Sequence, residues 1–212
     1  MTSTLATTDN TAILAEFTGG STTDVAMMIG IGLVKDSDAV FFQYVGEEQP
    51  AQALSYPSGK PVTRMANVKL RGVEVVDDIG EFKSTKLNLF LESSAGTIVM
   101  LTAGLQTIWS QCVVTALMGL VGTGNLDFAF TLDTWKGTSK MRPCFAAIRS
   151  GDVKMTDQMT YDQLADARGD RNKDKTMAIM RDAVANIKGA LTGGPVEEAV
   201  VTAVDPEAAE LF

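Results

Sequence analysis

One uncharged segment, residues 105–120, constrains the fold of this chain more than any other feature. Its apolar side chains recur at helical spacing, among them Ile108, Trp109 and Leu117, and this period predicts a helix. Because the segment contains no charged residue, such a helix has no side that favours contact with water. We therefore expect a mostly buried helix with Trp109 in the core.

The chain before this helix is of β type. Two β-rich runs, residues 86–92 and 97–102, are separated by a short loop that contains glycine, which predicts a hairpin. In the first run Phe90 alternates with three leucines and falls on the same side as Lys86. Phe90 is therefore expected on the polar side of its strand.

A longer strand is expected over residues 63–76. Strict alternation places Lys69, Arg71 and Val73 on the side opposite Val68, so that one side of this strand is basic.

The remaining segments complete a pattern of strands and helices. In one of them Phe128 alternates with acidic residues and lies with Phe130 on the apolar side. Strands are expected at residues 25–34, 39–45, 126–133 and 141–148, and amphipathic helices at residues 161–168 and from 174 to about 189.

Charge is distributed unevenly along the chain. The formal net charge is −8, but residues 60–154 contain eleven Lys and Arg against eight Asp and Glu. Residues 197–212 hold five acidic residues and no basic one, and they lack a core-forming pattern. We expect a flexible arm over 1–24, a β-rich domain over 25–155, helices over 156–190 and a disordered acidic tail over 191–212.

Composition excludes several classes of function. The chain of 212 residues has no histidine, the usual general base and zinc ligand. Cys112 and Cys144 lack metal-ligand spacing and are expected to be buried free thiols, with no metal or cofactor bound. No stretch is long and apolar enough to span a membrane and no signal peptide is recognisable, so a cytoplasmic location is expected.

An enzyme is not expected, because the carboxylates that could hold a catalytic metal have simpler roles. They lie in a turn or on the polar side of a strand, where acidic residues are common. The carboxylates considered are Asp77, Asp78, Glu81, Asp127 and Asp133.

The order of the expected elements is strand, hairpin, helix and two strands. This order resembles the OB-fold, a five-stranded Greek-key barrel with a helix between its third and fourth strands. The chain also resembles bacterial and phage single-stranded DNA-binding proteins, which join an OB-fold to an acidic tail ending in phenylalanine. Here the chain ends in Asp205 to Phe212, without the terminal Asp-Ile-Pro-Phe of the bacterial proteins, so a phage or plasmid form is the closer comparison.

The resemblance implies binding of single-stranded DNA and recruitment of replication or recombination proteins by the tail. Independently of it, single strands are bound by cations that contact phosphates and by aromatic rings that stack on bases. The expected phosphate contacts are Lys69, Arg71, Lys86, Lys136, Lys140, Arg142 and Arg149, the stacking residues are Tyr56, Phe90 and Trp135, and the tail residues that bind a partner are Glu207, Glu210, Leu211 and Phe212.

An oligomeric structural or adaptor protein that binds no nucleic acid is the alternative. In that case the long apolar run and the methionine-rich helix would form contacts between subunits.

Overall fold

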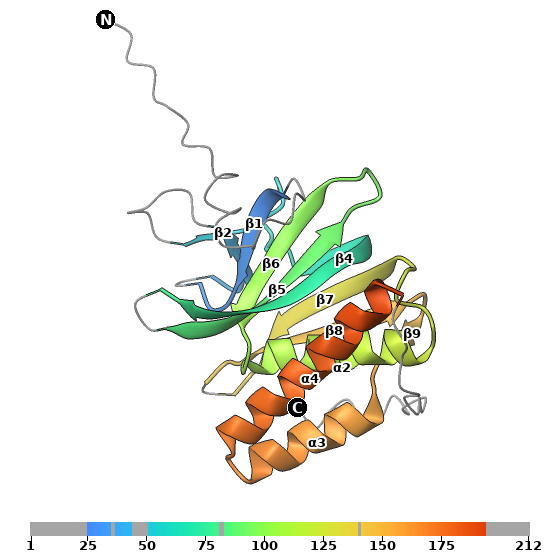
Figure 1. The fold of residues 1–212 in the computed structure, drawn as a ribbon. Coiled ribbons are helices and arrows are strands. Elements are labelled where there is room, and N and C mark those ends of the chain that lie inside the picture. The colour runs from blue at the N-terminus through green and yellow to red at the C-terminus, as the bar shows by residue number, and fades with distance from the viewer. Residues whose placement is uncertain (1–24, 35–36, 44–50, 81–82, 140, 194–212) are drawn as a thin grey trace, which may run out of the picture.

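The computed structural model describes residues 25–34, 37–43, 51–80, 83–139 and 141–193. The described chain is mainly β, with strands in one sheet and helices on one side of it (Figure 1). The strands are β1 (Val25–Ile31), β2 (Phe41–Gln43), β3 (Gln52–Ala53), β4 (Arg64–Ile79), β5 (Ser84–Glu92), β6 (Ile98–Gly104), β7 (Phe130–Lys136), β8 (Cys144–Ser150) and β9 (Val153–Lys154), and the helices are α2 (Ile108–Gly122), α3 (Gln158–Gly169) and α4 (Lys173–Leu191).

The sheet is open and mixed. Its strand order is β3-β2-β1-β6-β5-β4-β7-β8-β9, and among these strands the β1–β6 pair is parallel while the other neighbours are antiparallel. The expected order of strand, hairpin, helix and two strands is confirmed by β4, β5–β6, α2, β7 and β8. The expected five-stranded barrel is corrected, because closing these strands would require β6 to pair with β8. Strand β1 occupies that edge of β6 instead.

The hairpin and the central helix follow the sequence closely. In the β5–β6 loop the Ser93 amide donates to the Thr97 carbonyl, and Gly96 adopts a φ of 82°, which glycine tolerates without strain. Thr107 caps α2 by accepting a hydrogen bond from the Ser110 amide. Twelve residues of this 15-residue helix are buried, which confirms the expectation of a mostly buried helix.

Two irregularities change which side chains reach the core. A register shift between Leu70 and Gly72 inserts one residue into β4, so that Val73 lies on the same side as Leu70 and both are 3% exposed. The expectation that Val73 lies with the cations is therefore wrong. Strand β7 begins only at Phe130, and Phe128, expected on the apolar side of that strand, lies in a turn with 61% of its surface exposed.

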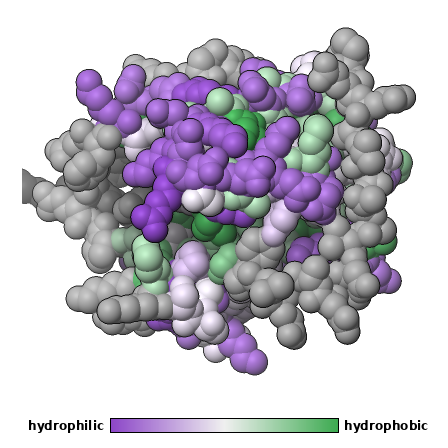
Figure 2. All heavy atoms as spheres, turned by 90° about the horizontal axis from the view of Figure 1, so that it is seen from below, coloured by the Kyte–Doolittle hydropathy of each residue, from purple (hydrophilic) through white to green (hydrophobic). Residues whose placement is uncertain are grey.

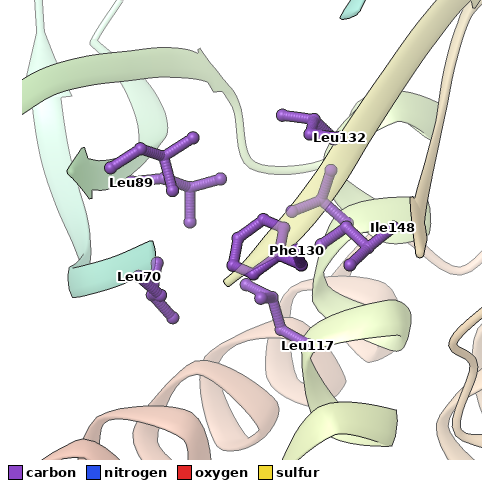
Figure 3. Close-up of a pocket in the computed structure, with 8 residues that line it drawn as sticks. Leu70, Leu89, Leu117, Phe130, Leu132 and Ile148 are labelled. Atoms are coloured by element: carbon purple, nitrogen blue, oxygen red, sulfur yellow. The ribbon is translucent and has the colours of Figure 1, made fainter. Parts of the chain in front are cut away.

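The core lies between the sheet and the helices. Side chains from β4, β5, β7 and β8 meet the α2 residue Leu117 there (Figure 3). Met180, Val184 and Ile187 of α4 belong to the same hydrophobic cluster, so the C-terminal helices share one core with the β-rich domain. The core residues labelled in Figure 3 are Leu70, Leu89, Leu117, Phe130, Leu132 and Ile148.

The two C-terminal helices have side-chain caps. Asp157 accepts a hydrogen bond from the Thr160 amide at the start of α3, and Asn172 accepts one from the Lys175 amide at the start of α4. Seen from the helix side, hydrophilic residues dominate the described surface (Figure 2). Among the described residues no helix is long and apolar enough to cross a membrane.

Candidate nucleic-acid interface

The sheet has a helix-covered side, which contains Leu89 and Leu132, and a helix-free side. Alternation along β5 and β7 assigns Lys86 and Trp135 to the helix-free side. The strand register brings cations from β4 and β8 to the same side. Of the residues predicted to contact nucleic acid, this side carries Lys69, Arg71, Lys86, Phe90, Trp135 and Arg149.

Trp135 is the exposed aromatic residue on this side of β7. Its side chain is 43% exposed, and its ring stacks on the ring of Phe145 in β8 with centroids 5.9 Å apart and an interplanar angle of 19°. Gly137 makes room for Phe145, because a Cβ atom at position 137 would lie 2.8 Å from the Phe145 ring. The indole is therefore supported by one ring while much of its surface remains in contact with solvent.

Two arginines share one carboxylate beside Trp135. The Nε atoms of Arg64 and Arg149 lie 2.5 and 3.5 Å from the two carboxylate oxygens of Asp133. Asp133 precedes Trp135 by two positions in β7, so the three charged groups lie on its side of the sheet. The hydrogen bond to Asp133 is the main cause of the raised pKa of Arg64. Two cations and one anion leave this cluster with a net positive charge.

Tyr56 precedes Arg64 by eight positions in the chain. It occupies the turn between β3 and β4, where the Gly59 amide donates to the Tyr56 carbonyl. Tyr56 is 47% exposed, and its electrostatic effect is the smallest of the causes that raise the pKa of Arg64. The structure thus brings two predicted contacts to the same side of β7, Trp135 and Arg149, and leaves Tyr56 exposed in the turn before Arg64.

The cations of β4 are less available to the phosphates of a bound strand. Arg71 donates from Nε to the Glu92 carboxylate over 2.6 Å, and Lys69 is paired in register with Glu92. Glu92 therefore offsets much of the positive charge that this part of β4 would offer to phosphates.

Phe90 is much less exposed than Tyr56 and Trp135, the other predicted stacking residues. It lies on the polar side of β5, as expected, but only 7% of its surface is exposed. Gly72 on β4 leaves space for its ring, since a Cβ atom there would lie 3.1 Å from the Phe90 ring. Position on the polar side therefore does not make Phe90 available to a base.

Lys136 and Arg142 contact the chain between β1 and β2. The Lys136 ammonium donates to the Ser37 carbonyl, and the Arg142 guanidinium forms a 2.8 Å ion pair with Asp38. These contacts fix the β7–β8 connection against a neighbouring segment. Lys140 and the tail residues Glu207, Glu210, Leu211 and Phe212 lie outside the described residues.

A pocket that sequence reasoning missed lies next to Trp135. It has a volume of about 110 Å³ and is bordered by α2, α3 and β8. Tyr161 and Arg168 of α3 line it, seven positions apart and hence on one side of the helix. This spacing is visible in the sequence, but the partner strand β8 is not. The lining residues used below are Cys112, Trp135, Phe145, Lys154, Tyr161 and Arg168.

The carboxylates considered as metal ligands have other contacts or lie apart. Asp77 is bound by Arg181 and Thr85, Asp133 is bound by two arginines, and Glu81 lies outside the described residues. Within the described ranges no group of three or more His, Cys, Asp or Glu side chains is placed to hold a metal ion.

Cys112 and Cys144 are both free and partly buried. Burial raises the pKa of each thiol.

Comparison of the chain with protein-family models, with curated proteins and with solved structures finds no match.

Proposed function

We propose that this protein binds single-stranded nucleic acid, DNA in the first instance, on the helix-free side of β7 and β8. The observation that carries the proposal is the exposed indole of Trp135, which rests on Phe145 beside the positive cluster of Arg64, Asp133 and Arg149. A base stacked on Trp135 would place its flanking phosphates near these arginines.

The physical basis is the way single strands are bound. Stacking of a base on an aromatic side chain contributes roughly 1–3 kcal/mol and tolerates any base. Arginine contacts with phosphates add affinity that falls as salt displaces them. A duplex has its bases already stacked, so Trp135 would favour single strands. The order of β4, β5, β6, α2, β7 and β8 along the chain is a further support for the proposal, although these strands lie in an open sheet.

The acidic tail is proposed to recruit a replication or recombination protein through Phe212 and the nearby carboxylates. Such a tail offers an aromatic ring and a terminal carboxylate to a small apolar pocket with a basic rim. Removing residues 197–212 should abolish this recruitment without removing the proposed nucleic-acid contacts.

The test is fluorescence anisotropy of a labelled oligothymidylate at about 50 and 200 mM salt, with a duplex of equal length as the comparison. We expect single-strand binding that weakens with salt, and duplex binding that is much weaker. Arg149→Gln should reduce the salt dependence, whereas Arg181→Gln on the helix side should leave it unchanged.

Equal affinity for duplex and single strand would contradict the proposal. Absence of binding at low salt, together with a defined oligomer in sedimentation, would favour the structural or adaptor alternative.

A further inference from the structure

The pocket beside Trp135 lies at an edge of the sheet that no described strand covers. Strand β9 pairs only with Arg149 and Ser150 of β8, so the preceding part of β8 has β7 on one side and no strand on the other within the described chain. Helix α2 packs along this edge, and α3 closes the pocket with Tyr161 and Arg168. The pocket is therefore built by three elements that are fixed in the core.

Its walls combine aromatic rings with uncompensated positive charge. Trp135, Phe145 and Tyr161 supply the rings, while Lys154 and Arg168 supply the charge. No carboxylate lines the pocket, and in the described chain neither cation forms an ion pair with a carboxylate. An anionic group would therefore enter without displacing a carboxylate from either cation.

Both cations line the same pocket as Cys112. Both act electrostatically on the thiol of Cys112, where they oppose the stronger effect of burial on its pKa. The Arg168 guanidinium donates from Nη1 to Oε1 of Gln111 over 2.6 Å. Because Gln111 is neutral, this bond orients the guanidinium and leaves its charge available.

The size of the pocket limits the ligand. Its volume of about 110 Å³ is well below the roughly 300–1,000 Å³ of pockets that enclose drug-sized ligands. It can enclose only part of one nucleotide, the rest of which would lie against the exposed surface of Trp135, and it is too small for a dinucleotide.

We infer that this pocket binds one nucleotide, with the base against the aromatic wall of Trp135 and the phosphate at Lys154 and Arg168. The inference rests on the proposed function, since the nucleotide would be one unit of a bound strand that leaves the helix-free side at the edge of β8. It adds residues from α2 and α3 to an interface otherwise formed by strands.

The two tryptophans and the two cysteines provide local readouts. Trp109 is 1% exposed and Trp135 is 43% exposed, so a ligand in the pocket should quench mainly the fluorescence of Trp135. Cys112 lines the pocket and Cys144 does not. Occupancy should therefore slow alkylation of Cys112 and leave that of Cys144 unchanged.

The experiment uses the full chain with thymidine monophosphate, thymidine and inorganic phosphate as separate probes. Alkylation of each cysteine by iodoacetamide is followed by mass spectrometry of its peptide. We expect thymidine monophosphate to protect Cys112 at concentrations at which neither thymidine nor phosphate does. Lys154→Gln with Arg168→Gln should weaken this protection roughly tenfold or more, as expected for loss of charged hydrogen bonds. Lys188→Gln on α4, also without an ion pair in the described chain, should not.

Unchanged alkylation of Cys112 at saturating thymidine monophosphate would overturn the inference, as would equal protection by phosphate alone. If an oligothymidylate binds without protecting Cys112, the pocket assignment fails while the proposed function stands. If thymidine monophosphate protects Cys112 but no oligonucleotide binds, the pocket stands as a mononucleotide site and the proposed function fails.

Discussion

The two tryptophans of this chain occupy opposite environments, one in the core and one at the surface. Trp109 lies in α2 and is 1% exposed, whereas Trp135 lies in β7 and is 43% exposed. The residue type does not explain this difference in exposure, because both residues are tryptophan. Trp109 lies between α2 and the sheet, whereas Trp135 lies on the helix-free side of the sheet, where its neighbours leave much of the ring in contact with solvent.

The two rings also differ in their contacts. The Trp109 Nε1 is buried and has no hydrogen-bond partner among the described residues, a cost that is accepted only where the large apolar ring gains more by burial. The exposed ring of Trp135, by contrast, stacks on the ring of Phe145. We therefore expect loss of Trp109 to affect folding and loss of Trp135 to affect binding.

The largest effect is expected from Trp109→Ala. Truncating a fully buried aromatic ring removes its burial and leaves a cavity, which typically costs about 3–5 kcal/mol of unfolding free energy. Denaturant unfolding followed by circular dichroism measures this loss. Trp109→Phe keeps most of the ring and removes the unpartnered Nε1 donor, so it should cost much less than the alanine variant. A Trp109→Ala protein as stable as the parent would contradict the position of α2 in the core.

Gly119→Ala tests how closely α2 approaches the chain before α3. A Cβ atom at position 119 would lie 2.8 Å from the backbone carbonyl of Thr156, and a backbone cannot move aside as a flexible side chain can. We expect a loss of about 1–3 kcal/mol, typical of overpacking, in the midpoint of denaturant unfolding. The matched control is Gly189→Ala in α4, where nothing lies within 4 Å and alanine should stabilise the helix by about 0.8–1 kcal/mol. Equal effects of the two substitutions would argue against the close approach.

Trp135→Ala should leave unfolding nearly unchanged and weaken single-strand binding. Loss of one stacked base corresponds to roughly 1–3 kcal/mol, or about 5- to 150-fold in affinity. Anisotropy titration and thermal melting of the same preparations separate the two effects. The control is Phe128→Ala, because Phe128 is also exposed but precedes Trp135 by seven positions, beyond the other end of β7. If both variants bind as the parent does, Trp135 is not a stacking platform.

Local patterns predicted elements well and predicted accessibility poorly. The hairpin and α2 were recoverable because their periodicity and turn residues occur within short stretches of sequence. The burial of Phe90 depends on Gly72 in another strand, and the position of Val73 depends on a bulge that alternation cannot reveal. The pocket beside Trp135 combines residues from α2, α3 and β8, and only the tertiary arrangement brings Lys154 near Arg168.

The smallest effect is expected from the ion pair that joins the sheet to α4. The Arg181 guanidinium lies 2.5 Å from the Asp77 carboxylate, and this hydrogen bond, followed by one from Thr85, lowers the pKa of Asp77. A carboxyl group whose pKa is lower in the folded state stabilises the fold above its unfolded pKa, and this stabilisation is lost as the pH falls through the folded pKa. Both partners are substantially exposed, so solvent screening keeps the contribution small.

Asp77→Asn should therefore be slightly less stable than the parent near neutral pH, and the difference in unfolding free energy should narrow below about pH 4. Urea unfolding at several pH values measures it, and Arg181→Gln should show the same narrowing, because either substitution removes the same pair. A difference that stays constant down to pH 2 would show that Asp77 stabilises the fold by a contact other than its charge.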